Sequence, residues 1–382
     1  MGILNDLLKD VFDISKLKDA VSELKKMDTL LTQISRTNDR LSRSDLADLG
    51  SSAFRAAGRY GMNAADYLAA FQEASRAGYR DARGMAELAL AAQNAGNLTA
   101  ELAERLLSAT DQAYRMGGSV SELTKVLDGL NHISGRNTLD MAALSEGMAG
   151  LGSTAASLGV DASQAAAALG TLITVSRQSG SEAADAFKTI LLFLGQITDA
   201  EEGITVKGLR QYEAACKALN VSLYETKDGI RSLRDPMGIL EELAAAYNRL
   251  GEDDTRRSSL LDPLGDSASA EGLDALLSRW DTYETMLQQY ADGTGSLAAD
   301  AEKTANSWEG SLNRLSNTWT ETVGNLTDSD AIVAAINTLN SLLSSVNSLT
   351  DKLGPLASIG LGAGLFAGIR NTGKRRMSVR IS

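Results

Sequence analysis

Small and apolar residues recur with helical spacing through the middle of the chain. Between Leu139 and Ile197, runs of Ala, Leu and Gly are interrupted by polar corners at 158–161 and 178–181. Each corner contains a glycine placed to end one helix and an Asp or Ser placed to cap the next. The pattern predicts three helices that approach closely through small side chains, with a few large apolar residues supplying most of the contact area.

Upstream of this stretch, short predicted helices alternate with short turns. Turns are expected at 61–63, 77–79, 96–99 and 116–119, each before a capped helix. Short helices joined in this way should form a compact bundle. The irregular turn spacing disfavours a strict solenoid, but recurrence every fifteen to twenty residues keeps a repeat array as the alternative.

The pattern changes after Ile197. Short apolar–polar alternations flank Asp228-Gly229, a pair typical of tight hairpin turns, and predict a small β-hairpin. Asp235-Pro236 then supplies an N-cap and a first-turn proline for another helix. The charged and then Ser/Ala/Gly-rich stretch at 251–272 is predicted to be a flexible linker.

From Leu273 the helices are predicted to lengthen, with apolar positions stepping by three and four. A narrow apolar seam with an uncharged polar back suits self-association or docking on another surface. It is equally expected of a two-helix hairpin that folds back on the core. The predicted seam residues are Trp308, Leu312, Leu315, Trp319, Ile332, Ile336, Leu339, Leu343 and Val346.

Residues 353–369 form an uncharged, Gly-rich apolar segment, and five Lys and Arg residues follow it. Its seventeen residues are at the lower limit for crossing a hydrocarbon layer of ~30 Å. Gly360, Gly364 and Gly368 share a face that permits close helix packing. The segment is therefore either a small-residue helix packed inside an oligomer or a membrane-inserting element. The basic tail is a solvated end, or a site for DNA or lipid phosphates.

Composition supports an all-α fold. Among 382 residues there are three Pro and 5% aromatic residues, and the hydrophobic 43% is dominated by Ala and Leu. We predict an Ala/Gly-rich multi-helix bundle with one small β-hairpin, followed by longer amphipathic helices and a C-terminal apolar segment. The predicted domains are N-terminal amphipathic helices at 1–43, an Ala-rich helical core at 44–200, a helix–hairpin–helix insertion at 201–250, the linker at 251–272, long coiled-coil-like helices at 273–352, the apolar segment at 353–369 and the basic tail at 370–382.

Candidate chemistry is sparse. Cys216 lies on an apolar helical face, which favours a core residue over a reactive thiol, and His132 is interpreted as a cap or surface residue. A single Cys and a single His leave no disulfide and no His/Cys metal cluster, so we predict no catalytic residue, metal or cofactor. A net charge of −12 disfavours nucleic-acid binding by the body of the chain. The acidic, amphipathic N-terminus does not have the pattern of a signal peptide, so we expect synthesis in the cytoplasm.

Three consecutive segments carry a family resemblance. An Ala-rich helix ends in Leu-Gly-Val at 155–160, a second Ala-rich helix occupies 161–172, and GSEAADAFK restarts the pattern at 180–188. Related features continue at 214–223, 228–229 and 236–243. In this order they resemble the shared core region of the phage tail tape-measure protein family.

The resemblance implies a structural protein whose apolar seam serves assembly, by self-association or by docking on the tail tube wall. Because the sequence has no Cys/His pair or metal motif, we predict no enzymatic activity. Several copies would lie in the tail tube lumen, act as scaffold and length ruler, and leave ahead of the DNA at ejection. The implied partners are other copies, tube subunits, tail assembly chaperones and baseplate or tail-tip proteins, with no sequence-specific nucleic-acid binding. The implied location is the virion, with entry into the host envelope on ejection as a further option.

Two alternatives to a tape-measure protein stay open at this point. A membrane-inserting or pore-forming tail-tip protein would use residues 353–369 as its active element. A peptidoglycan hydrolase would need a cleft with a Glu of raised pKa, and no Cys/His pair or metal motif supports one. The chain is also short for the resembled family, so a short-tail version, a degraded prophage copy or a piece of a longer reading frame are all consistent with its length.

Overall fold

The computed structural model describes residues 14–38, 41–197, 204–227, 229–265 and 267–325. The chain divides into a main unit, Met27–Gly310, and a second unit made of residues 1–26 and 311–382. The described part of the second unit is the first half of α2 (Ile14–Thr37) and most of α17 (Trp308–Asn325).

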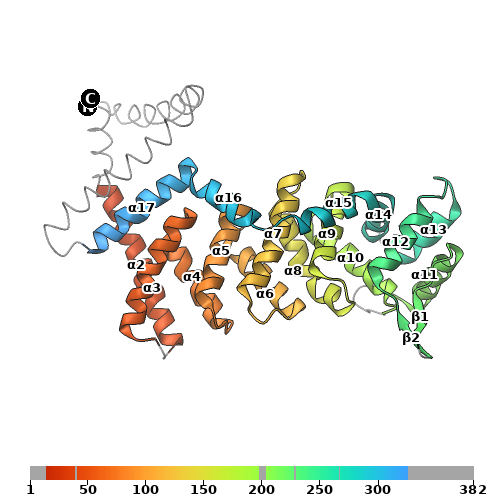
Figure 1. Ribbon diagram of the computed structural model, residues 1–382, viewed down its shortest axis with the longest axis horizontal. Coiled ribbons are helices and arrows are strands. Elements are labelled where there is room, and N and C mark those ends of the chain that lie inside the picture. Colours follow the sequence, from red (N-terminus) through yellow and green to blue (C-terminus); the bar gives the residue numbers. More distant parts are fainter. Residues whose placement is uncertain (1–13, 39–40, 198–203, 228, 266, 326–382) are drawn as a thin grey trace, which may run out of the picture. The chain divides into compact units, whose positions relative to one another are not determined.

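Helices α3 to α10 of the main unit pack in the order in which they occur along the chain (Figure 1). The most extensive contacts join α6 to α8 and α8 to α10. We call these eight helices the array. This arrangement confirms the predicted multi-helix bundle and its succession of short helices and turns. The array helices are α3 (Arg43–Tyr60), α4 (Ala64–Arg76), α5 (Ala82–Gly96), α6 (Ala100–Tyr114), α7 (Val120–Arg136), α8 (Met141–Ser157), α9 (Ala162–Ser176) and α10 (Gly180–Leu194).

The corners on either side of α9 are built by capping residues. The Asp161 carboxylate accepts hydrogen bonds from the backbone N–H groups of Ser163 and Gln164, at 2.8 and 2.9 Å. The Gln164 side chain accepts the Asp161 N–H in return, which completes a capping box. Ser179 forms the equivalent box with Glu182 at the start of α10. Both corners lie where predicted, and Gly159 adopts the left-handed conformation at the first. At the second corner the expected glycine stop is wrong, because Arg177 ends α9 in the left-handed conformation and Gly180 is the first residue of α10.

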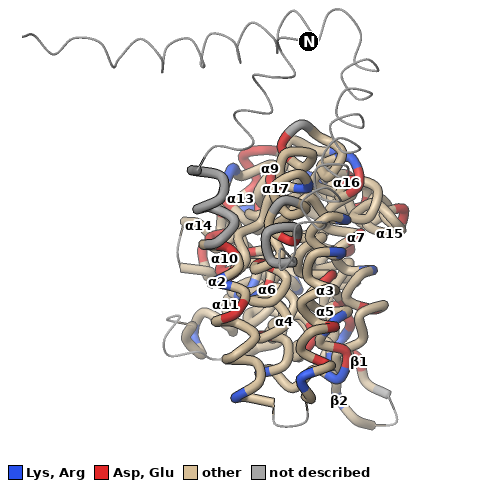
Figure 2. Tube along the Cα trace, turned by 90° about the vertical axis from the view of Figure 1, so that its left-hand side faces the viewer, with Lys and Arg blue, Asp and Glu red and all other residues tan. Residues whose placement is uncertain are grey.

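Small residues make the array dense. Ala165, Ala166, Ala167 and Ala168 are all fully buried in α9. At the crossing of α8 and α10, a Cβ built on Gly180 would lie 1.9 Å from the carbonyl oxygen of Ala143. Only glycine permits this approach, so the predicted close packing through small side chains is confirmed. Outside this core, Lys and Arg are intermixed with Asp and Glu over the described chain (Figure 2).

A small insertion follows the array. It consists of α11 (Val206–Ala218), an antiparallel pair of strands, β1 (Tyr224–Lys227) and β2 (Ile230–Leu233), and α12 (Pro236–Tyr247). In the hairpin Tyr224 is opposite Leu233 and Lys227 is opposite Ile230. Gly229 has a φ of +77°, the left-handed conformation that such a turn requires. The predicted hairpin is confirmed.

The stretch predicted as a flexible linker, 251–272, is largely helical where it is described. It contains α13 (Thr255–Leu261), the 3₁₀ turn η1 (Asp262–Leu264) and the beginning of α14 (Ser267–Ser278). Asp254 caps α13, and Leu260 and Leu264 are buried. The polar composition of this stretch reflects short helices with one apolar side each, rather than a loop.

Three further helices return over the array in reverse order (Figure 1). Helix α14 packs on α10 and α9, α15 (Trp280–Ala291) on α9 and α7, and α16 (Ser296–Ala305) on α7, α5 and α3. We call residues 267–305 the strap. Its helices contain 12, 12 and 10 residues. The sequence predicts longer helices from Leu273 onwards. The strap does not contain them, because α14 ends at Ser278 and α15 ends at Ala291.

Candidate functional site

The contact between strap and array is centred on one buried carboxylate. Asp128, in the middle of α7, is 5% exposed. Its two carboxylate oxygens accept hydrogen bonds from the backbone N–H groups of Gly295, at 2.8 Å, and Leu297, at 3.0 Å. Because α16 begins at Ser296 and its N-cap residue forms no side-chain cap, Asp128 caps this helix from another part of the chain. The charge also lies favourably at the positive end of the helix dipole.

Further polar contacts hold the same helix. The Ser296 hydroxyl donates a hydrogen bond to the Asp128 backbone carbonyl at 2.7 Å. One turn along α7, the Asn131 amide donates to the Asp300 carboxylate at 2.8 Å. Asn131 is itself buried, so this bond satisfies a polar group that would otherwise be costly to bury. Side chains of α7 therefore fix both the start and the second turn of α16.

The strap also fits into notches formed by glycines of the array. A Cβ on Gly129 of α7 would lie 2.4 Å from the ring of Tyr290, and one on Gly170 of α9 would lie 2.6 Å from the sulfur of Met286. Both large side chains come from α15. The position of this helix therefore depends on two array residues having no side chain.

Sequence reasoning missed these residues, because little in their local pattern marks them. Asp128 and Asn131 are polar residues on an otherwise apolar helical face, and Gly129 and Gly170 are glycines in the interior of predicted helices. Such positions weaken a helix unless a tertiary contact requires them. A helix-weakening residue at a buried position could therefore have indicated a tertiary contact. The sequence does not show the partner, because the partner helices lie more than a hundred residues away along the chain.

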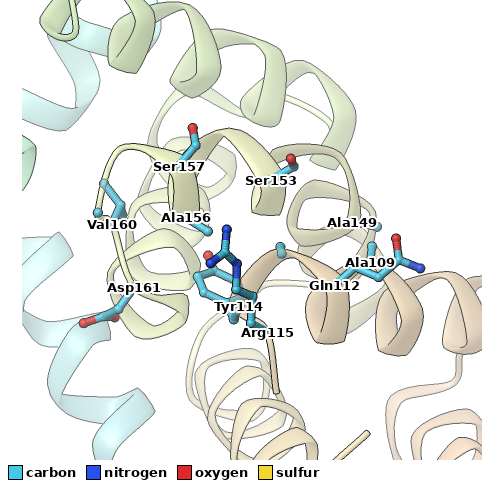
Figure 3. Close-up of a pocket in the computed structure, with 12 residues that line it drawn as sticks. Ala109, Gln112, Tyr114, Arg115, Ala149, Ser153, Ala156, Ser157, Val160 and Asp161 are labelled. Carbon is cyan, nitrogen blue, oxygen red and sulfur yellow. The ribbon is translucent and has the colours of Figure 1, made fainter. Parts of the chain in front are cut away.

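A cavity of about 810 Å³ opens between α6, α8 and the corner before α9 (Figure 3). Its walls combine alanines with the polar side chains of Gln112, Ser153 and Ser157. The Tyr114 hydroxyl is buried there without a hydrogen-bond partner, and burial raises the pKa of that hydroxyl. Arg115 and Asp161 add one charge of each sign to the lining.

A smaller cavity, of about 280 Å³, lies between α4, α5 and α6. Glu73, Glu101, Glu104 and Arg105 contribute to its lining, together with several alanines. Burial raises the pKa of Glu104, and the charges of Glu73 and Glu101 raise it further. A Glu of raised pKa is one requirement for a hydrolase. The volume lies just under the ~300–1,000 Å³ typical of ligand pockets.

The remaining candidates for chemistry have structural roles. Cys216 is buried in α11, and burial raises the pKa of its thiol to about 12, which confirms the prediction of a core residue. His132 lies partly buried in α7, one turn before that helix ends, and does not cap it. Within the described ranges no group of three His, Cys, Asp or Glu side chains could hold a metal ion.

The predicted seam and membrane face are only partly within the described residues. Leu312 is exposed and Leu315 is partly buried on α17, the helix that also contains Trp308 and Trp319. The seam residues Ile332, Ile336, Leu339, Leu343 and Val346, and the glycines Gly360, Gly364 and Gly368, lie outside the described residues. Both interpretations stay predictions. Among the helices that are described, none is both long and apolar enough to cross a membrane.

Comparison with known proteins identifies the family. The sequence matches the phage-related minor tail protein family over residues 43–265, which is more than half of the chain. The match begins with α3 and ends after η1, so it covers the array, the hairpin insertion and α13. No solved structure matches the chain. The matched family is one of phage tail components, and this chain belongs to the phage-related minor tail protein family.

Proposed function

We propose that the protein is a tape-measure protein, which acts as scaffold and length ruler inside the tail tube and is released at genome ejection. We further propose that it has no enzymatic activity. The observation that carries the proposal is the position of the apolar seam relative to the fold. The seam begins at Trp308, two residues before the main unit ends at Gly310, and it lies beyond the family match. The chain thus combines a folded tail-protein unit with a following segment of heptad-like spacing.

The folded unit itself is a poor ruler. An α-helix rises ~1.5 Å per residue, so the 18 residues of α3 span only about 27 Å. The strap returns over the array and adds residues without adding length in one direction. In our proposal the ruler is therefore the segment 308–352. The main unit is the part that contacts tail partners, namely other copies, tube subunits, assembly chaperones and baseplate proteins.

Tail length measured by electron microscopy tests this proposal. A tandem duplication of residues 308–351 adds 44 residues, and as α-helix these should lengthen the tube by about 66 Å. A half duplication of 308–329 should give about 33 Å, and it remains informative if the full duplication assembles poorly.

The matched control inserts 44 Gly and Ser residues between Glu252 and Asp253, two exposed positions between α12 and α13. We expect normal tails from this variant. Tails of normal length from both duplications would refute the ruler role of 308–352. Equal lengthening by the control would instead show that any added residue counts, and would contradict the division of roles between the main unit and the segment that follows.

A further inference from the structure

We propose that the strap holds the array helices in place and can detach from them as a unit. Residues 267–305 detach and unfold as one segment while α3 to α10 stay folded. This inference concerns the main unit alone and holds whether or not the chain sets tail length.

The first observation is that the strap helices have little contact with one another. Contacts between α14 and α15 are few and those between α15 and α16 fewer still, whereas each strap helix packs extensively on at least two array helices. Isolated helices shorter than ~12–15 residues are marginally stable in water. The strap helices, of 12, 12 and 10 residues, therefore owe their stability to the helices on which they pack, which for α14 include α12 as well as α9 and α10. Once detached, the segment has no core of its own and unfolds.

The second observation is that the array has contacts that do not involve the strap. The most extensive interfaces of the main unit, α6 with α8 and α8 with α10, join array helices to each other. Where α15 is seated, the array contributes Gly129 and Gly170, and Tyr290 and Met286 fill the space above them. Removing the strap empties these notches but leaves the close crossing of Gly180 and Ala143 intact. Opening is thus expected to occur between strap and array, rather than within the array.

The third observation is the Asp128 cap. The backbone N–H groups of Gly295 and Leu297 are satisfied by this one carboxylate, which lies on the array side of the interface. When the strap detaches, water can reach both the carboxylate and the freed N–H groups, so no buried charge is left unpaired. The cap therefore stabilises the attached strap without preventing its detachment. Removal of the cap should destabilise the strap and leave the rest of the array unchanged.

Detachment would increase the distance that this part of the chain can span. The strap contains 39 residues, and fully extended they span at most about 130–140 Å. The main unit could thus release a long extended segment that leads to residue 310, while the array stays folded.

Hydrogen exchange of the full-length chain, followed by mass spectrometry at increasing denaturant, tests the proposal. We expect peptides from α14, α15 and α16 to share one opening free energy, lower than that of peptides from α8 and α10. Replacing Asp128→Ala should increase exchange in the strap by about five- to thirty-fold, the range expected for loss of a helix cap, and leave α8 and α10 unchanged.

The matched control is Asp140→Ala, which removes the cap of array helix α8, where the carboxylate accepts the Ala142 N–H at 2.9 Å. This variant should accelerate exchange in α8 and not in the strap. If Asp128→Ala does not fold, Gln289→Ala tests the same interface, because it removes the 2.7 Å hydrogen bond from the Asn137 amide to α15. A single opening free energy shared by strap and array in the unmodified chain would overturn the proposal. So would equal acceleration of both by a strap-specific substitution.

Discussion

The crossing of α8 and α10 allows a prediction whose sign and size both follow from the structure. Gly180 is the first residue of α10, and an added Cβ would lie 1.9 Å from the oxygen and 2.7 Å from the carbon of the Ala143 carbonyl. Because both atoms belong to the backbone of α8, no side-chain rotation relieves the clash. The helices would have to separate by roughly 1.5 Å to bring the nearest contact to an ordinary distance.

Overpacking of this kind costs about 1–3 kcal/mol, and a clash with backbone belongs at the upper end of that range. Replacing glycine by alanine also reduces the entropy of the unfolded chain, which offsets about 0.4–1 kcal/mol. Gly180→Ala should therefore lower the free energy of unfolding by about 2 kcal/mol.

Gly150→Ala provides a control on the same helix pair. Its Cβ would lie 3.6 Å from the Cβ of Ala184 on α10, an ordinary contact distance. Since Gly150 is in the interior of α8, we expect this substitution to stabilise the protein by about 0.5–1 kcal/mol. Urea unfolding followed by circular dichroism measures both changes. A Gly180→Ala protein as stable as the unmodified chain would refute the reasoning about this crossing.

Two further predictions follow from buried titratable groups. Burial raises the pKa of the Cys216 thiol to about 12, so a disulfide reagent at pH 8 should label it only as the protein unfolds; labelling at the rate of a free cysteine would show that α11 does not bury it. Burial also raises the pKa of Tyr67 to about 12, whereas in the unfolded chain this group ionises near its ordinary pKa of 10.0. Because the raised pKa belongs to the folded state, the associated stability should be complete below pH 10 and lost between about pH 10 and 12. Urea midpoints across this range, compared with those of Tyr67→Phe, measure the effect, and identical pH dependence of the two proteins would contradict it.

Much of the local structure can be predicted from the sequence because its signals act over a few residues. Asp161 and Ser179 each bond to groups two or three residues ahead, so their presence alone marks the beginnings of α9 and α10. The left-handed turn at Gly229 is equally local, and the alternating residues on both sides of it predict its flanking strands. The alanines and glycines of α8 to α10 likewise indicate close packing from their spacing alone.

The position of the strap on the array depends on the tertiary structure. Asp128 and Gly295 are 167 residues apart, and no periodicity along the chain reports that one caps the helix beginning beside the other. Contacts with distant parts of the chain also explain why the composition of 251–272 predicts a flexible linker although this stretch forms short helices. The apolar faces of these helices are short, and they become stabilising only against the surfaces that bury Leu260 and Leu264. Local hydrogen bonds are determined by neighbouring residues, whereas the burial of a short amphipathic helix depends on the whole of the surface that covers it.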